Sequence, residues 1–557
     1  MSLGWGPRFR SNVRVAMRDG VELSTDLYLP DGPGPFPVVV SRTPYNNTLP
    51  WIVAKGRTLV DAGYAVAMQD VRGRFDSYGE YEPFRDEGPD SVDTIAWLAA
   101  QPWSSGRVGM SGRSYSGWTQ WTAAAEGSPH LAAIVPRVMA TDLHRGLIWR
   151  GGALNLGVLL TWGLNTSGRS MQELSPVDWV EAFRTLPVAA AADAASQDLP
   201  FWRDWLAHPA RDAYWEAVDY ERRHAEMTVP ALIMGGWYDL YSDDVFRQFN
   251  AMRAAPSPAA RHSQLIVGAW PHALSASTKT GSLDFGARSL LDLEAAELRW
   301  YDRWLKGMPN GAEDDAPLRI FVMGSNAWRE EREWPLARTD WQRWYLHSAG
   351  HANTLAGDGS LSPEPPADEP ADRYVYDPAV PVPTHGGGNC CSPDIVPWGP
   401  YDQRDLEMRP DVLCYTSEPL AQAMEVTGPI TVVLWAATDA PDTDWTGKLV
   451  DVWPSGRAIN LCDGILRARF RDGPGAERLL ESGELARYEI DLMVTGNTFL
   501  PGHRIRVEIS SSNFPRFDRN PNTGAPIGTS AEVRPAHQAV VHDASHPSHV
   551  LLPVIPA

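Results

Sequence analysis

VGMSGRSYSGWTQW, residues 108–121, places a serine between two glycines where an apolar run gives way to a helix-compatible run. Gly112 and Gly117 flank Ser114, and glycine lets the backbone reverse sharply and approach its neighbours closely. A strand-to-helix turn that exposes one serine hydroxyl is the nucleophile elbow of α/β hydrolases. Short Gly/Ser patterns also occur in ordinary loops between a strand and a helix. The rest of the chain must decide between these two interpretations.

Buried strands and helices alternate around this stretch. Short apolar runs predict strands, and amphipathic segments between them predict helices. The strands are expected at 36–41, 64–70 and 107–110, the helices at 47–62 and 90–100, and a β-hairpin around Asp19-Gly20 at 13–30. Strands that alternate with helices in this way indicate a doubly wound sheet or an α/β-hydrolase sheet.

The pattern changes twice further along the chain. Residues 141–228 carry helical patterns and no convincing strand, as expected of a helical cap inserted over a site. Strand patterns return at 229–234 and 264–268, followed by an amphipathic helix at 294–305.

The last third consists mainly of short strands separated by Gly/Pro/Asp turns, typical of an antiparallel sandwich or jelly roll. The strands are expected at 430–436, 447–452, 488–494, 505–510 and 539–552.

The expected fold class is therefore α/β: an α/β-hydrolase fold with an inserted all-helical cap and a C-terminal β jelly-roll domain. A chain of 557 residues exceeds what one hydrophobic core usually organises. The expected domains are a hydrolase domain in two parts (1–140 and 229–340), a cap (141–228) and the jelly roll (341–557).

Composition excludes several classes of partner. The net charge of −20 repels phosphate backbones and anionic membrane surfaces, so neither nucleic acid nor a membrane is expected. Residues 1–20 lack the apolar core of a signal peptide, and the longest apolar-leaning stretch, 154–164, is too short to span a bilayer. We therefore expect a soluble protein in the cytoplasm.

Neither the cysteines nor the acidic residues form a clear metal motif. Four cysteines provide no disulfide framework and no C-x-x-C spacing. Cys390 and Cys391 are adjacent, so they form either a vicinal disulfide or two packed thiols, and base rates favour the thiols. Asp439, Asp442 and Asp444 suggest calcium ligands, but their spacing defines no coordination shell and fits a turn better.

A nucleophilic serine needs a base, and the base needs an orienting carboxylate. In α/β hydrolases the order along the chain is serine, acid, histidine, each on a loop that follows a strand. Asp239 follows the strand expected at 229–234, and His272 follows the strand expected at 264–268. They are the candidate acid and base for Ser114.

Other assignments of the acid and base stay open at this point. Asp243 and Asp244 lie close enough in sequence to replace Asp239 as the acid. Asp239 could also only cap a helix. His262 precedes its strand, which is the wrong end for a catalytic base.

An oxyanion formed at the substrate carbonyl needs two donors. One is the backbone N–H after the nucleophile, here that of Tyr115. The other should come from the loop at 41–47, where Tyr45 follows a proline and could donate its phenol proton. The alternative is that Tyr45 only packs this loop.

The chain resembles a family of serine hydrolases that includes bacterial cocaine esterases, X-prolyl dipeptidyl peptidases and α-amino-acid ester hydrolases. The matching segments cover nearly the whole chain. They are SRTPYNN (41–47), QDVRGRFDSYGEY (69–81), QPWSSGRVGMSGRSYSG (101–117), GGWYDLY (235–241) and VGAWPHA (267–273), with longer segments at 425–471, 501–524 and 546–555. The resemblance implies the same three-part architecture.

The resemblance assigns the roles of nucleophile, acid and base to Ser114, Asp239 and His272. It makes the Tyr45 hydroxyl the second oxyanion donor, beside the Tyr115 amide.

The resemblance also implies an aromatic acyl pocket, whose rings fall on Trp149, Trp162 and Tyr241; the two tryptophans could equally be core residues. Leu240 replaces a glycine, and Ser116 stands where an acid would support binding of a free amine. These departures favour a neutral, partly aromatic ester.

The expected function is a serine carboxylesterase that acts on small to medium esters, with an amide or peptide hydrolase of the same family as the alternative. A third hypothesis is an inert hydrolase scaffold whose jelly roll binds carbohydrate. No metal or organic cofactor is expected, because the sequence has no H-E-x-x-H, Walker or dinucleotide-binding motif. The expected partner is a small-molecule ester, with a homodimer as an open possibility.

Overall fold

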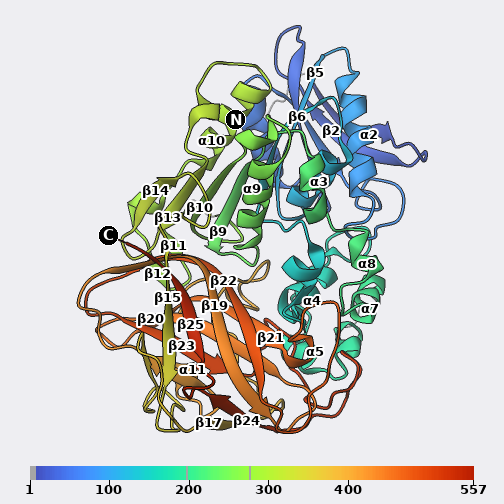
Figure 1. The fold of residues 1–557 in the computed structure, drawn as a ribbon. Helices are drawn as coiled ribbons and strands as arrows, with labels where there is room; N and C mark the ends of the chain where they lie inside the picture. The colour runs from blue at the N-terminus through green and yellow to red at the C-terminus, as the bar shows by residue number, and fades with distance from the viewer. Residues whose placement is uncertain (1–7, 196–198, 275–276, 557) are drawn as a thin grey trace.

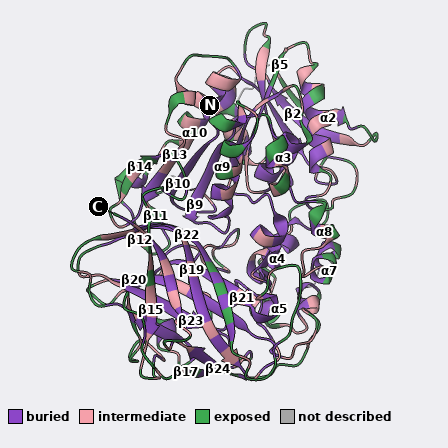
Figure 2. Cartoon of the chain, viewed as in Figure 1, coloured by how far each residue is buried: buried purple, intermediate pink, exposed green. Residues whose placement is uncertain are grey.

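The computed structural model describes residues 8–195, 199–274 and 277–556, which form two large sheets with a helical segment beside both (Figure 1). Residues 1–7, part of the stretch used for the signal-peptide prediction, lie outside the described residues. Strands of both sheets are mostly buried, while exposed positions gather on loops and outer helix faces (Figure 2).

The first sheet has ten strands in the order β1-β2-β4-β3-β5-β6-β9-β10-β13-β14. Its central strands from β4 to β13 run parallel, and the outer strands β1, β2 and β14 pair antiparallel. The bounds are β1 (Phe9–Ala16), β2 (Glu22–Tyr28), β3 (Phe36–Thr43), β4 (Ala65–Asp70), β5 (Ser104–Arg113), β6 (Leu131–Arg137), β9 (Leu232–Tyr238), β10 (Gln264–Pro271), β13 (Leu318–Val322) and β14 (Ala327–Glu331). The exchange of β3 and β4 in this order, together with the crossover helices, confirms the α/β-hydrolase fold predicted from the sequence.

Helices cover both faces of this sheet, and the apolar strands supply both cores. Val38 and Val40 belong to one buried cluster and Val39 to another, as the two-residue period of a strand requires. The first cluster packs under α2 (Glu87–Ala99) and α3 (Tyr115–Glu126), and the second under α1 (Pro50–Asp61) and α10 (Leu293–Trp304). Helix α9 (Asp244–Ala254) follows β9.

The segment between β6 and β9 is the predicted cap, but it is not entirely helical. Its helices are α4 (Leu156–Thr166), α5 (Trp179–Arg184), α6 (Ala191–Ala194), α7 (Pro200–Ala207) and α8 (Ala213–Glu216). A short hairpin, β7 (Trp149–Arg150) and β8 (Ala153–Leu154), was not predicted because its strands have only two residues each. The hairpin packs on the C-terminal domain, where the Leu154 N–H donates to Asp518 at 2.7 Å.

The second sheet has eleven strands and is almost entirely antiparallel, as predicted for the C-terminal domain. Its strands are β15 (Asp340–His347), β16 (Ser360–Ser362), β17 (Asp372–Tyr376), β18 (Leu413–Thr416), β19 (Met424–Thr438), β20 (Asp444–Val452), β21 (Ala458–Arg467), β22 (Ala486–Phe499), β23 (Arg504–Ser510), β24 (Ala536–Val541) and β25 (His549–Ile555). The single strand expected at 539–552 is therefore two strands. A turn rich in small and polar residues separates β24 from β25.

The domain boundaries expected from the sequence are kept as a proposal. The first sheet ends with β14, before residue 340, and β15 begins the second sheet at Asp340. Within the described ranges, no helix combines the length and apolar character needed to cross a membrane.

Candidate active site

Strand β5 passes directly into α3 at Ser114, which has the strained backbone of a nucleophile elbow, with φ +56°. A Cβ at Gly112 would lie 2.3 Å from the Ser116 Cβ, so this turn accepts only glycine at that position. At Gly117, a Cβ would lie 3.0 Å from Met139 on the neighbouring chain segment. The two glycines thus have the steric role that the sequence suggested, and Ser114 itself stays partly exposed.

Asp239 and His272 meet at the carboxyl ends of two adjacent parallel strands, β9 and β10. His272 Nδ1 lies 2.6 Å from Asp239 Oδ2, and both side chains are buried. The other carboxylate oxygen, Oδ1, accepts the backbone N–H of Tyr241 at 2.9 Å. With both oxygens engaged, the carboxylate orients the imidazole through Nδ1 and leaves Nε2 on the side of the ring away from Asp239.

The alternative acids pair with arginines. Asp243 Oδ1 lies 3.3 Å from Arg150, and Asp243 also pairs with Arg247. Asp244 Oδ2 lies 3.5 Å from the same Arg150. His262 is exposed before β10. The geometry therefore favours Asp239 and His272 over these alternatives.

Tyr45 lies beside the elbow, as the oxyanion prediction required. Its phenol oxygen accepts the indole N–H of Trp162 at 3.0 Å. Burial raises the pKa of Tyr45, while its interactions with the Ser114 side chain and the Tyr115 backbone lower it, and the net shift is upward. Tyr45 therefore stays protonated near neutral pH, with Trp162 on one side of its oxygen and Ser114 close by.

The Tyr115 backbone is held by its own side chain. The Tyr115 hydroxyl donates to Glu87 Oε1 at 2.7 Å and accepts the Phe84 N–H at 2.9 Å. Glu87 in turn pairs with the fully buried Arg42 at 2.7 Å. The sequence offered no signal for this arrangement, because the partners come from separate elements. It fixes the start of α3, where the Tyr115 N–H, the backbone candidate for an oxyanion donor, lies.

A small cavity of about 10 Å³ adjoins Ser114 and collects most of the predicted pocket residues. Its walls include Tyr45, Ser114, Tyr115, Trp162, Tyr241, Phe84 and several aliphatic side chains. The Tyr241 ring centroid lies 5.9 Å from that of His272. Trp149 is not among the described residues that line this cavity. It lies in β7 and its ring is buried, so its place in the acyl pocket stays a prediction.

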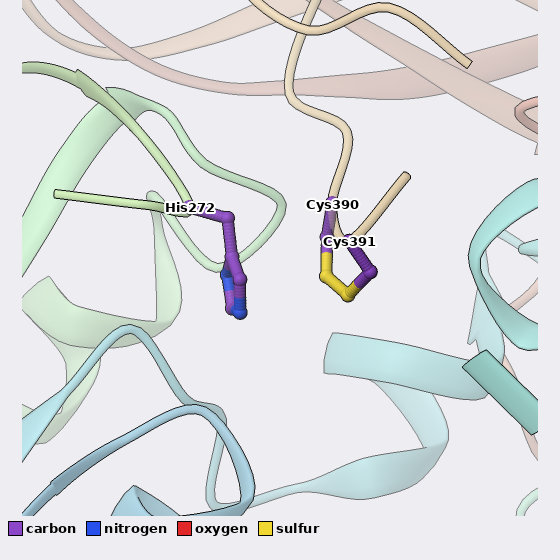
Figure 3. Close-up of side chains that lie close together, drawn as sticks. All are labelled: His272, Cys390 and Cys391. Carbon is purple, nitrogen blue, oxygen red and sulfur yellow. A yellow bond between two sulfur atoms is a disulfide. The ribbon is translucent and has the colours of Figure 1, made fainter. Parts of the chain in front are cut away.

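Cys390 and Cys391 also line this cavity, and sequence reasoning did not place them there. They come from the C-terminal domain, in a loop that approaches the acid so closely that a Cβ at Gly388 would lie 2.9 Å from the Asp239 carbonyl oxygen. Their sulfurs are joined in a disulfide, contrary to the two thiols that base rates favoured. Figure 3 shows the disulfide beside the His272 ring. The run HGGGNCC at 385–391 was the only signal in the sequence, since glycines permit such a close approach.

The acidic residues that suggested calcium ligands pair with basic side chains in the C-terminal domain. Asp442 pairs with Arg469 at 2.8 Å, and Asp444 pairs with Arg467 at 2.9 Å. Asp439 lies 2.9 Å from His537. Asp442 and Asp444 thus each pair with an arginine, and the interpretation of this run as a turn stays a prediction.

Known proteins and family models are similar to this chain over nearly its whole length. Residues 19–274 match the model of the X-Pro dipeptidyl-peptidase (S15 family), and residues 310–551 match the X-Pro dipeptidyl-peptidase C-terminal non-catalytic domain. Cocaine esterase of Rhodococcus sp. (strain MB1 Bresler) is 40% identical, with 98% of each chain covered.

Two solved structures are similar over almost their full lengths, each at 28% identity. An aminopeptidase from a marine sediment archaeon of the Thaumarchaeota has a TM-score of 0.87, with 100% of this chain and 99% of that chain covered. An α-amino acid ester hydrolase has a TM-score of 0.84, with 98% and 96% covered. The chain therefore belongs to the X-Pro dipeptidyl-peptidase S15 family of serine hydrolases, in which cocaine esterase is one of its relatives.

Proposed function

We propose that the protein is a carboxylesterase that hydrolyses small to medium esters, with an aromatic or cyclic acyl group, through Ser114, His272 and Asp239. The observation that carries the proposal is the 2.6 Å hydrogen bond between Asp239 and His272, beside a cavity that also contains Ser114 and Tyr45. Similarity to a cocaine esterase supports an ester as the substrate.

In the first step, His272 Nε2 removes the Ser114 proton as Oγ attacks the ester carbonyl carbon. The carbonyl oxygen becomes an oxyanion, which the Tyr45 hydroxyl and the Tyr115 N–H stabilise. The protonated imidazole then gives its proton to the departing alcohol, and an acyl-enzyme remains. Asp239 keeps the imidazole in the correct tautomer and stabilises its cationic form.

In the second step, water takes the place of the alcohol. His272 removes a proton from the water as its oxygen attacks the acyl carbonyl carbon, and the same two donors stabilise the second oxyanion. Collapse of this intermediate breaks the bond to Ser114 Oγ, which recovers its proton from the imidazole. The carboxylic acid product leaves, and all atoms of the enzyme return to their starting state.

The charge of the pocket supports a neutral acyl group. In the described part of the chain, no carboxylate lines the cavity beside Ser114. Acids near the site are already paired, Asp239 with His272, Glu87 with Arg42, and Asp243 with Arg150 and Arg247. A free ammonium group would therefore lose its hydration without gaining an unpaired carboxylate.

The cavity beside Ser114 is too small for an aromatic acyl group unless side chains that line it move. A cavity of about 10 Å³ holds about one water molecule. An aromatic acyl group needs more space, so side chains such as Trp162 or Tyr241 must move as it enters. We propose these two rings as the walls that contact the acyl group.

Amide hydrolysis is the second candidate function, because one similar structure is described as an aminopeptidase and the family model is that of a dipeptidyl peptidase. The experiment compares kcat/KM for p-nitrophenyl acetate, butyrate and benzoate with that for Ala-Pro p-nitroanilide. We expect the esters to be the better substrates and the Ser114→Ala variant to lose both activities. A clear preference for the anilide would reject the esterase proposal, and full activity in Ser114→Ala would reject the triad.

The remaining partner predictions need separate measurements. A small ester is the proposed partner, and a homodimer stays a prediction that sedimentation of the purified protein would test. Specific sugar binding without hydrolysis of any ester would favour the inert-scaffold hypothesis instead.

A further inference from the structure

Two cysteines lie beside the proposed catalytic histidine, and the three residues together offer three potential metal ligands. The sulfurs of Cys390 and Cys391 and a ring nitrogen of His272 all lie within 4.8 Å of one another. His272 and Cys390 are buried, whereas Cys391 is exposed at the mouth of the group. The ligands come from two different domains, and Figure 3 shows them facing one another. No ion is expected while the sulfurs are joined, because a disulfide has no thiolate to offer.

We propose that reduction of the Cys390–Cys391 bond creates a site for a thiophilic divalent cation such as Zn²⁺, held by the two thiolates and His272 Nε2, and that the bound ion inhibits the hydrolase. Sulfur and imidazole ligands select Zn²⁺ and similar ions over Mg²⁺ or Ca²⁺. The inhibition rests on the proposed function of His272, whereas the binding of the metal does not.

The histidine already has the environment of a zinc ligand. Its Nδ1 is hydrogen-bonded to Asp239 at 2.6 Å, which leaves the lone pair of Nε2 available. Metal-binding histidines usually donate their second ring N–H to a carboxylate, which orients the ring and raises its basicity. Asp239 and His272 thus already have the carboxylate–histidine arrangement that is usual for a histidine bound to zinc.

The distances fit a four-coordinate ion after small movements. With Zn–S bonds of about 2.3 Å and Zn–N bonds of about 2.0–2.1 Å, tetrahedral ligand atoms lie roughly 3.5–3.8 Å apart. The limit of 4.8 Å, which holds for one ring nitrogen of His272, exceeds this spacing by about 1 Å, and rotation of the side chains would bring Nε2 and the two sulfurs together. A water molecule would complete the coordination from the exposed side of Cys391.

The loop that carries the cysteines is fixed at its base. The Asn389 side-chain amide donates to the carbonyl of Gly386 at 3.0 Å and to that of Pro397 at 2.6 Å. The Gly387 and Gly399 backbones pair with each other at 2.8 and 2.9 Å. These contacts do not involve the sulfurs, so the loop keeps the two cysteines beside His272 when their bond is broken.

The chemistry balances with an ordinary thiol as reductant. Two thiol molecules supply two electrons and two protons, become one disulfide, and leave Cys390 and Cys391 as separate thiols. Zn²⁺ then displaces one proton from each thiol, and His272 contributes its lone pair. Because Nε2 is the base that activates Ser114, its coordination removes the base from catalysis. After removal of the metal, exchange with a small-molecule disulfide restores the Cys390–Cys391 bond and releases two thiol molecules.

Binding is tested without reference to activity. The protein is reduced with a phosphine, which converts to its oxide as the disulfide opens, and is then titrated with Co²⁺ in place of Zn²⁺. We expect the near-ultraviolet thiolate charge-transfer band and the visible bands of tetrahedral Co²⁺ at one equivalent. The oxidised protein and the variant Cys390→Ser/Cys391→Ser should show neither. That variant keeps the buried Cys414 and Cys462, so it also controls for binding elsewhere.

The third ligand and the inhibition have their own readouts. The His272→Asn variant should bind Co²⁺ about ten-fold more weakly or worse. In the reduced wild type, Zn²⁺ at about ten times its dissociation constant should lower ester turnover about ten-fold, with recovery on addition of a chelator. Oxidised wild type and the double serine variant should keep their own uninhibited rates.

Several results would overturn the proposal. Alkylation and mass spectrometry must show two new thiols after reduction; a bond that resists reduction excludes the site. The site is also excluded if the reduced wild type shows no cobalt spectrum, or if the serine substitutions leave that spectrum unchanged. Binding without loss of turnover rejects the inhibition. If the protein hydrolyses no ester at all, the proposed function fails, while the cobalt titration still decides the metal site.

Discussion

Substitution of Tyr45 by phenylalanine removes one hydroxyl group from beside Ser114 and leaves the aromatic ring in place. The phenol oxygen accepts the Trp162 indole N–H at 3.0 Å and interacts with the Ser114 side chain and the Tyr115 backbone. Since the indole already donates to this oxygen, the phenol proton is available to the oxyanion. Burial raises the pKa of Tyr45, so the group stays a donor throughout the neutral pH range.

The expected loss follows from the role of an oxyanion donor. Removal of one such donor costs about 2.7–4 kcal/mol of transition-state stabilisation, or roughly 10²–10³ in kcat. The Tyr115 amide remains, so activity should persist at this lower level. The negative charge develops only in the transition state, and KM should therefore change little. The Trp162 N–H loses its partner, which should lower folding stability by about 1–3 kcal/mol.

The assay measures kcat and KM for p-nitrophenyl butyrate, with unfolding in urea to confirm that the variant is folded at the assay temperature. Tyr241→Phe is the matched control, because it removes a second phenol from the same cavity without removing a proposed oxyanion donor. A Tyr45→Phe enzyme whose kcat stays within about threefold of wild type would refute the assignment.

Asp239→Asn should lower kcat by about 10⁴, because the amide favours the wrong imidazole tautomer, and unchanged turnover would exclude this acid. Gly112→Ala should cost about 1–3 kcal/mol or more in unfolding free energy and impair turnover, since its Cβ would lie 2.3 Å from that of Ser116. Burial raises the pKa of Asp70 from 3.8 to about 7, so this group favours folding below pH 4 and loses that contribution as pH rises through 7. The unfolding free energy of Asp70→Asn should therefore rise relative to that of wild type between pH 4 and pH 8, by at most about 4 kcal/mol. Urea titrations at several pH values measure it, and a difference between the two proteins that does not change with pH would contradict the raised pKa.

The parts of the fold that follow strong local patterns could be predicted from the sequence. The apolar runs before the elbow and before Asp239 and His272 correspond to the strands β5, β9 and β10. Each candidate catalytic residue then follows from its place at the carboxyl end of a strand. Strand β6 was not predicted, because Pro136 interrupts its apolar run, yet it pairs on both sides within the sheet.

Features that depend on contacts between distant segments could not be predicted. The hydrogen bond from Trp162 to Tyr45 joins the cap to the loop after β3, so no local pattern reports it. The same is true of the support of Tyr115 by Glu87. The position of Cys390 and Cys391 beside His272 depends on how the C-terminal domain packs on the first sheet, and local periodicity carries no information about that. For Trp149, the resemblance predicted a place in the acyl pocket, but the described residues that line the cavity do not include it.

Covalent labelling with a fluorophosphonate tests most directly whether Ser114 is the nucleophile that His272 activates. The reagent should inactivate the enzyme at one equivalent, and peptide mass spectrometry should locate the adduct on Ser114, with no adduct there in His272→Ala. Complete inactivation with the label on another side chain, or an active enzyme that the reagent never modifies, would contradict the account.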